Sequence, residues 1–190
     1  MMKPISASLI VMASLSACAT PTPPTVTASD VDDAFDEATR ISALPQTAIA
    51  DLPTGSVTYN GQIGANVSGD AQGSILADMT MIVGFSSNDI DGNVSNINLI
   101  NPDGTPDQLL TGTLQMSGIE SNGDLDATAS GTVQGVDNSG FVVNSDMNIV
   151  LDGAVYDDTG QGDAVYGSAE GAANGDFLLD IDGVFFGTSN

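Results

Sequence analysis

The stretch FSSNDIDGNVSNI, residues 85–97, has the residue types of a cation-binding loop, with carboxylate and amide side chains around a glycine. A helix-loop-helix calcium loop that began at Asp89 would need glycine at its sixth position and glutamate at its twelfth. Val94 and Ile100 stand there instead. Because apolar and polar residues alternate along the stretch, it predicts a hairpin, with a turn at 86–88 and then a strand with an acidic outer face.

Two other segments have a weaker likeness to calcium sites. Residues 159–167 (TGQGDAVYG) are similar to one imperfect copy of a glycine-and-aspartate calcium repeat, but a single copy cannot stack into the solenoid that makes such sites. Residues 101–107 (NPDGTPD) have the composition of a turn. We therefore expect no metal site in the chain.

Few residues of the chain have side chains that could carry out catalysis. The chain has no histidine, which excludes Ser-His-Asp and Cys-His catalysis and imidazole metal ligands. Paired carboxylates among the 25 Asp and Glu could serve glycoside hydrolysis, and Tyr59, Tyr156 or Tyr166 could each ligate haem iron. The tyrosines stand at ordinary strand positions, so packing is the favoured interpretation. We expect a non-enzymatic protein with no catalytic residues and no cofactor.

The only cysteine, Cys18, follows a segment with the features of an export signal. A lysine near the start supplies positive charge, and residues 9–15 are largely apolar but too few to cross a bilayer as a helix. The sequence LSAC at 15–18 is similar to the bacterial lipobox, whose cysteine is lipidated and becomes the first residue. We predict a lipoprotein signal peptide over 1–17 and an acylated, palmitate-type anchor on Cys18.

The residues after the cysteine predict a tether and then one helix. Ala19, where aspartate would suggest inner-membrane retention, favours the outer membrane. Residues 18–28, rich in Pro and Thr, predict a flexible lipidated spacer. Residues 29–51 predict a short amphipathic helix and a linker, with Ser29 as the N-cap and the helix packed on the domain rather than lying on a membrane.

From Gly55 onward the hydrophobic period is two, which predicts one all-β domain over residues 52–190. Gly, Asn and Asp clusters separate the runs and no helical pattern lies between them, so we expect an eight-stranded up-and-down antiparallel β-barrel. The expected strands lie at 56–67, 74–85, 89–100, 110–119, 124–134, 141–155, 163–173 and 176–187.

The same alternation predicts which side chains point inward. The inner face is expected to hold Leu125, Ala127, Phe141 and Phe185, with small residues such as Gly167 at many other inward positions. Side chains are expected to fill the interior, since an eight-stranded barrel is just wide enough for them or for one small ligand. The outward residues are acidic and polar, which excludes a lipid-facing barrel wall.

Several motifs resemble those of the transferrin-binding protein B-like β-barrel surface lipoproteins, in particular their small, single-barrel relatives. They are LPTGSVTYNGQI (52–63), LADMTMIVGFSSNDIDGNVSNI (76–97), GAVYDDTGQGDAVYGSAEG (153–171) and DGVFFG (182–187). The resemblance implies a barrel fold and a role in binding. The chain departs from the large transferrin binders in having one barrel, no handle domain and almost no basic residues, so no binding residue is carried over.

Charge narrows the set of partners. The formal net charge is -23, which repels nucleic acid and anionic lipid surfaces. We expect a monomeric lipoprotein, anchored in the outer membrane on its cell-surface or periplasmic side, that binds a protein or a small molecule in nutrient or metal acquisition. The alternative is a structural envelope lipoprotein without a soluble ligand.

Overall fold

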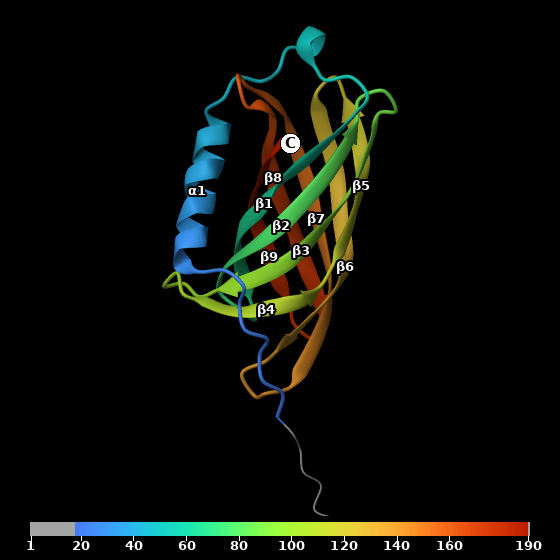
Figure 1. The fold of residues 1–190 in the computed structure, drawn as a ribbon. Helices are drawn as coiled ribbons and strands as arrows, with labels where there is room; N and C mark the ends of the chain where they lie inside the picture. The colour runs from blue at the N-terminus through green and yellow to red at the C-terminus, as the bar shows by residue number, and fades with distance from the viewer. Residues whose placement is uncertain (1–17, 190) are drawn as a thin grey trace, which may run out of the picture.

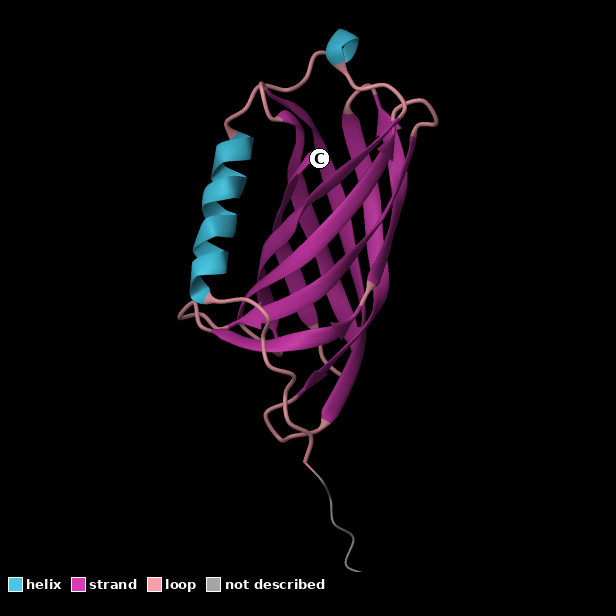
Figure 2. Ribbon diagram, in the orientation of Figure 1, coloured by secondary structure: helices cyan, strands magenta, loops and turns pink. Residues whose placement is uncertain are grey.

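The computed structural model describes residues 18–189, which form one α-helix beside a single closed sheet (Figures 1 and 2). The helix α1 (Ala28–Ser42) precedes a short 3-10 turn, η1 (Ile49–Asp51). The strands are β1 (Ser56–Gly69), β2 (Gly73–Gly84), β3 (Asp89–Ile100), β4 (Pro106–Gly112), β5 (Leu114–Ser121), β6 (Asp124–Val136), β7 (Val142–Asp158), β8 (Gly162–Gly175) and β9 (Leu179–Ser189). The predicted signal peptide lies outside the described residues.

The sheet closes into a ring because its first strand pairs with its last. Antiparallel pairing of β1 with β9 joins Tyr59–Gly69 to Leu179–Ser189, and β2 and β3 complete the circuit. Closure leaves few unpaired strand edges, which matters for long strands that carry few charged side chains of mixed sign. The predicted all-β class with antiparallel pairing is confirmed.

The predicted number of strands is wrong by one. The run expected at 110–119 is divided at Thr113 into β4 and β5, which both lie between β3 and β6. Opposite this division, Asn96, with φ 53°, adds a bulge to β3. Gly112, with φ 134°, takes a backbone conformation that favours glycine. The bulge shifts the register of β3 by one residue, and its partner strand is interrupted there.

Side chains pack the interior of the ring. The predicted inward residues Leu125, Ala127 and Phe185 are buried, with Phe185 completely so. Other fully buried side chains include Tyr59, Ile63, Met79, Met81 and Leu114. The prediction for Phe141 is wrong, because this residue lies in the turn before β7 and its side chain is 67% exposed.

Helix α1 packs on the outer face of the ring, over β8, β9 and β1 (Figures 1 and 2). Its buried residues are Ala34, Ala38 and Ile41, and they contact a second apolar cluster, separate from the core inside the ring. The sheet side of that cluster consists of Leu76, Ile100, Ala164 and Phe186. The packed amphipathic helix predicted from the sequence is therefore confirmed.

The expected N-cap, Ser29, is wrong by two residues. The cap is Thr27, whose hydroxyl oxygen accepts a hydrogen bond from the Asp30 N–H at 3.3 Å. In return the Asp30 carboxylate accepts from the Thr27 N–H at 2.6 Å, which completes a capping box and lowers the pKa of Asp30. The third residue after Thr27 is acidic, as is the third after Ser29, so the two registers look alike in the sequence.

Arg40 joins the helix to the end of β7. Its guanidinium lies 2.9 Å from the Asp158 carboxylate, whose side chain is only 7% exposed, and 2.8 Å from the Glu37 carboxylate. Hydrogen bonds from Arg40 lower the pKa of Glu37. Since Arg40 is the one basic side chain of residues 18–189, no other cation in that range can neutralise Asp158.

Replacing Arg40 by methionine should therefore destabilise the fold by about 2 kcal/mol, because a buried carboxylate loses its partner while the arginine itself is partly exposed. The double variant Arg40→Met, Asp158→Asn should recover most of this loss. Glu37→Gln, which affects only the exposed pair, is the control and should change little. Urea unfolding followed by circular dichroism measures all three, and a failure of Asp158→Asn to restore stability would contradict the role given to the buried charge.

Candidate functional site

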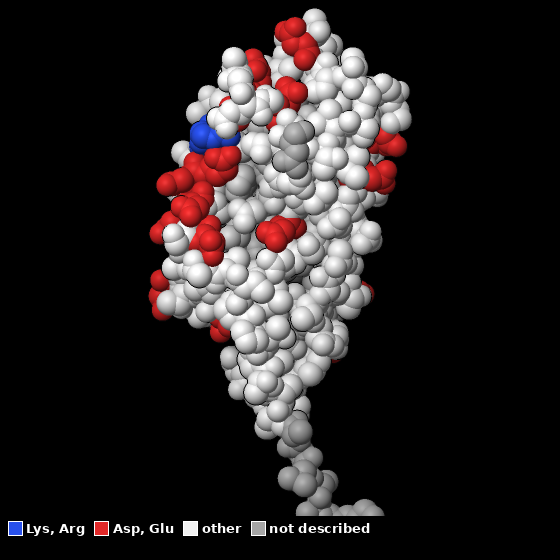
Figure 3. Space-filling model, in the orientation of Figure 1, with Lys and Arg blue, Asp and Glu red and all other residues white. Residues whose placement is uncertain are grey.

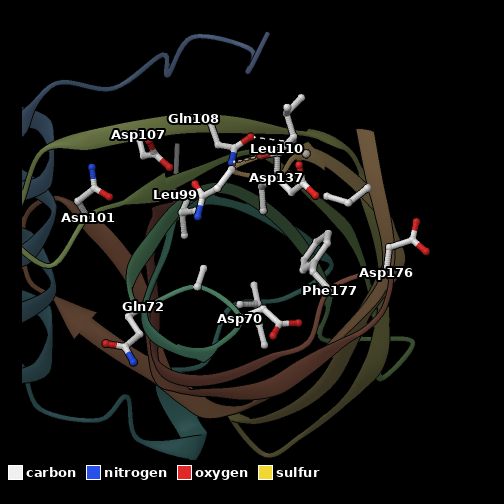
Figure 4. Close-up of a pocket in the computed structure, with 16 residues that line it drawn as sticks. Asp70, Gln72, Leu99, Asn101, Asp107, Gln108, Leu110, Asp137, Asp176 and Phe177 are labelled. Atoms are coloured by element: carbon white, nitrogen blue, oxygen red, sulfur yellow. Dashed lines mark hydrogen bonds between the residues drawn. The ribbon is translucent and has the colours of Figure 1, made fainter. Parts of the chain in front are cut away.

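A pocket of about 440 Å³ opens at the end of the ring where β4 diverges from β6 (Figure 4). The two strands pair only at Thr111 and Gly112, although β6 continues to Val136. The side-chain amide of Gln108 bridges the gap: its nitrogen donates to the Val136 carbonyl at 3.1 Å, and its oxygen accepts from the Val136 N–H at 3.0 Å. This buried amide holds the wall of the pocket in place of strand pairing.

The pocket combines an apolar floor with an acidic rim. Figure 4 shows the ring of Phe177 directed into the opening, with carboxylate and amide side chains around it. The apolar lining includes Leu99, Leu110, Val143, Phe177 and Leu179, and the polar lining includes Asp70, Gln72, Asn101, Asp107, Asp137 and Asp176. Because neither Lys nor Arg lines it, the pocket offers hydrogen-bond acceptors and negative charge to a ligand.

Backbone N–H groups position three of the rim carboxylates. Asp70 accepts from the Leu178 N–H at 2.8 Å, and Asp176 accepts from the Asn144 N–H at 3.0 Å. Asp137 accepts from the N–H groups of Ser139 and Phe141, both at 2.8 Å. These hydrogen bonds fix the turns at the pocket mouth, so the rim is largely formed before any ligand binds.

The acidic stretch that resembled a calcium loop lies elsewhere. Residues 85–88 form the predicted turn, and Asp89 begins β3 at the opposite end of the ring, where its carboxylate accepts a hydrogen bond from the Ser87 hydroxyl. Ile90 and Val94 point into the core, as the alternation predicted. Across residues 18–189 no three acidic or cysteine side chains are close enough together to hold a metal ion.

The three tyrosines occupy two separate places. Tyr59 is fully buried inside the ring, and its hydroxyl has no hydrogen-bond partner within the described part of the chain. Burial, with a smaller contribution from the charge of Asp163, raises the pKa of Tyr59. Tyr156 and Tyr166 lie together on the outer face, edge to face with ring centroids 6.2 Å apart, beside a shallow depression next to the linker. They contact the cluster beneath α1 and so help to attach the helix.

Cys18, the predicted lipidation site, is exposed beside the β6–β7 turn at the pocket end of the ring. The Ala19 N–H donates to the Gly140 carbonyl at 2.9 Å, and the Thr22 carbonyl accepts from the Leu109 N–H at 2.9 Å. Residues that were expected to form a spacer thus lie along the ring beside β4 (Figure 1).

The pocket is not evident from the sequence. Its rim comes from turns that are far apart in the chain, at 70–72, 101–105, 137–141 and 176–178. In an up-and-down sheet alternate turns meet at the same end, and each of these turns contains an aspartate. This pattern indicates an acidic rim at one end of the sheet. The role of Gln108 could not be predicted from the sequence, since it depends on the separation of β4 from β6.

Comparisons of the chain with protein-family models, with curated proteins and with solved structures give no match. Within residues 18–189, no helix has the length and apolar character needed to span a membrane.

Proposed function

We propose that this chain is a non-enzymatic lipoprotein, anchored through Cys18 in the outer membrane, that binds a small amphiphilic ligand. We take the ring as an up-and-down β-barrel with eight strand positions, in which β4 and β5 share one. The observation that carries the proposal is the end pocket of about 440 Å³, with its apolar floor and preformed acidic rim. This volume lies in the range of small-molecule sites, and the apolar floor resembles their lining.

The lining suggests the chemistry of the ligand. Leu99, Leu110 and Phe177 offer surface to an apolar chain or ring, while Asp107 and Asp137 favour a cationic or hydrogen-bond-donating head group. An anionic head would face several carboxylates and no basic side chain. Capture of an amphiphilic amine as a nutrient is the process that fits this chemistry.

A titration with two eight-carbon probes tests the proposal. Isothermal calorimetry should show that octylamine binds to the protein, whereas octanoate, with the opposite charge on a similar chain, should not bind. Asp107→Asn should weaken octylamine binding about 3-fold, as expected for the loss of one exposed charge interaction. Asp126→Asn, which removes an exposed carboxylate from the outer face of β6, is the matched control and should have no effect.

A second variant tests the apolar floor of the pocket. Ala71 lines the pocket and is partly buried, so Ala71→Leu should fill part of the volume and abolish octylamine binding. Equal binding of octylamine and octanoate, or equal effects of the two Asp→Asn changes, would contradict the proposal.

The alternative is a structural envelope lipoprotein, and the packed interior of the ring supports it, because fully buried side chains such as Phe185 and Tyr59 occupy the space inside. Under this alternative neither probe would bind, and deletion of the protein would change envelope integrity and not solute uptake.

A further inference from the structure

Cys18, the proposed point of lipid attachment, lies at one tip of the ring. A Cβ atom placed on Gly140, in the β6–β7 turn, would lie 3.2 Å from the Cys18 Cβ and 3.6 Å from its sulfur. The Ala19 N–H donates to the carbonyl of the same glycine at 2.9 Å. Any acyl chain on Cys18 would therefore begin within a few side-chain lengths of the pocket mouth, which Asp137 and Val136 line.

The segment that follows Cys18 is held on the ring at several points. The Thr22 carbonyl accepts from the Leu109 N–H at 2.9 Å. Further along, the Thr25 N–H donates at 2.8 Å to the side-chain oxygen of Asn98, a fully buried residue. The Asn98 side-chain nitrogen donates to the Asn96 carbonyl at 2.8 Å, so the hydrogen bonds of this segment extend to the bulge of β3. With these contacts the ring cannot swing freely about a lipid on Cys18.

Large apolar side chains are exposed at the same tip. Phe141 is 67% exposed, Leu178 54% and Val142 49%, in or next to the turns that connect β6 to β7 and β8 to β9. In Figure 3 the acidic side chains of the visible face gather along the helix and the upper part, whereas the tapered lower tip is largely uncharged. Exposed apolar groups beside a proposed lipid attachment point are what a membrane-contacting surface requires.

We propose that this apolar tip, formed by Phe141, Val142 and Leu178, rests in the bilayer that holds the anchor, so that the pocket mouth faces the lipid. The inference rests on the proposed lipid anchor at Cys18. A zwitterionic lipid surface is the partner, because Asp70, Asp107, Asp137 and Asp176 at this end would repel an anionic one. The ligand of the pocket then comes from the membrane and not from free solution.

Single tryptophans test this orientation, because the chain contains no natural tryptophan. The variants are Phe141→Trp and Leu178→Trp at the tip, and Ile119→Trp, whose side chain is 61% exposed at the opposite end, as the matched control. The lipidated proteins are reconstituted in phosphatidylcholine vesicles with brominated acyl chains. Tryptophans at the tip should lose about half of their emission, as expected for side chains buried 5–10 Å into the interface, and the control should lose almost none. Equal quenching at the three positions would overturn the inference.

A second preparation separates this result from the anchor itself. The Phe141→Trp chain beginning at Cys18 is coupled through its single thiol to a maleimide phospholipid in the same vesicles, so attachment no longer depends on lipidation in the cell. Quenching of its tryptophan in this preparation supports the orientation even if the natural protein proves to carry no lipid. Absence of quenching here, with the protein shown to be attached, overturns the orientation and leaves the proposed anchor standing.

Discussion

Replacing Cys18 by serine should move the protein from the membrane fraction to the soluble fraction. Under the proposed function, acyl chains on this thiol attach the protein to the membrane, and the described residues hold no other cysteine. Each buried methylene contributes about 0.8 kcal/mol, and several acyl chains on one residue give firm anchoring. The expected change is from nearly complete sedimentation with membranes to nearly complete release, measured by fractionation and by the mass of the N-terminal peptide.

The control for this experiment keeps the cysteine and changes its neighbour. Ala19→Ser preserves the thiol and the backbone hydrogen bond to Gly140, so this variant should stay with the membranes. Circular dichroism should be the same for both variants, because the exposed Cys18 side chain contributes little to the core. A Cys18→Ser protein that remained in the membrane fraction after a high-pH wash would show that another feature attaches it.

The strands and the hairpins between them could be predicted from the sequence because their signals are local. Alternation in residues 124–134 placed Leu125 and Ala127 inside, and turn residues marked the hairpin ends. Each of these predictions depends only on residues that are neighbours along the chain. The division of one expected strand at Thr113 could not be predicted, since it accompanies a bulge at Asn96 on a different strand.

The candidate site could not be predicted from the sequence for a related reason. Gln108 is buried because β4 leaves β6, and its amide then takes over the hydrogen bonds of Val136. Nothing about a glutamine in a polar run indicates such a contact. The hydrogen bond from Thr25 to Asn98 likewise joins residues 73 positions apart. The Pro and Thr content of residues 18–28, which predicted a flexible lipidated spacer, does not indicate this contact. Contacts between distant residues fixed both features.

Gly167→Val should have the largest effect on stability of any single change considered. Gly167 lies opposite Gly153 on β7 and opposite Phe185 on β9. A Cβ atom on Gly167 would meet the Asp152 carbonyl oxygen and the Gly153 Cα, and would lie 2.6 Å from the Phe185 ring. Two of these neighbours are backbone atoms, so the strands themselves would have to separate, which should cost at least about 3 kcal/mol.

The matched control is Gly64→Val, on β1. Gly64 is also an extended strand glycine, but a Cβ atom there would meet no other atom within 4 Å. Valine favours strands, so this variant should be neutral or slightly more stable than the natural protein. Thermal unfolding followed by circular dichroism should show a melting temperature lower by about 6–12 °C for Gly167→Val only.

A third variant identifies which atoms cause the loss. If the Phe185 ring were the main obstacle, shortening it in the double variant Gly167→Val, Phe185→Leu would restore stability. We expect no recovery, because the closest neighbours of the new side chain are the backbone atoms of Asp152 and Gly153, which a smaller residue 185 does not move. Recovery in the double variant would show that the close approach of β7 to β8 tolerates a side chain, and that glycine is required here only to make room for the aromatic ring.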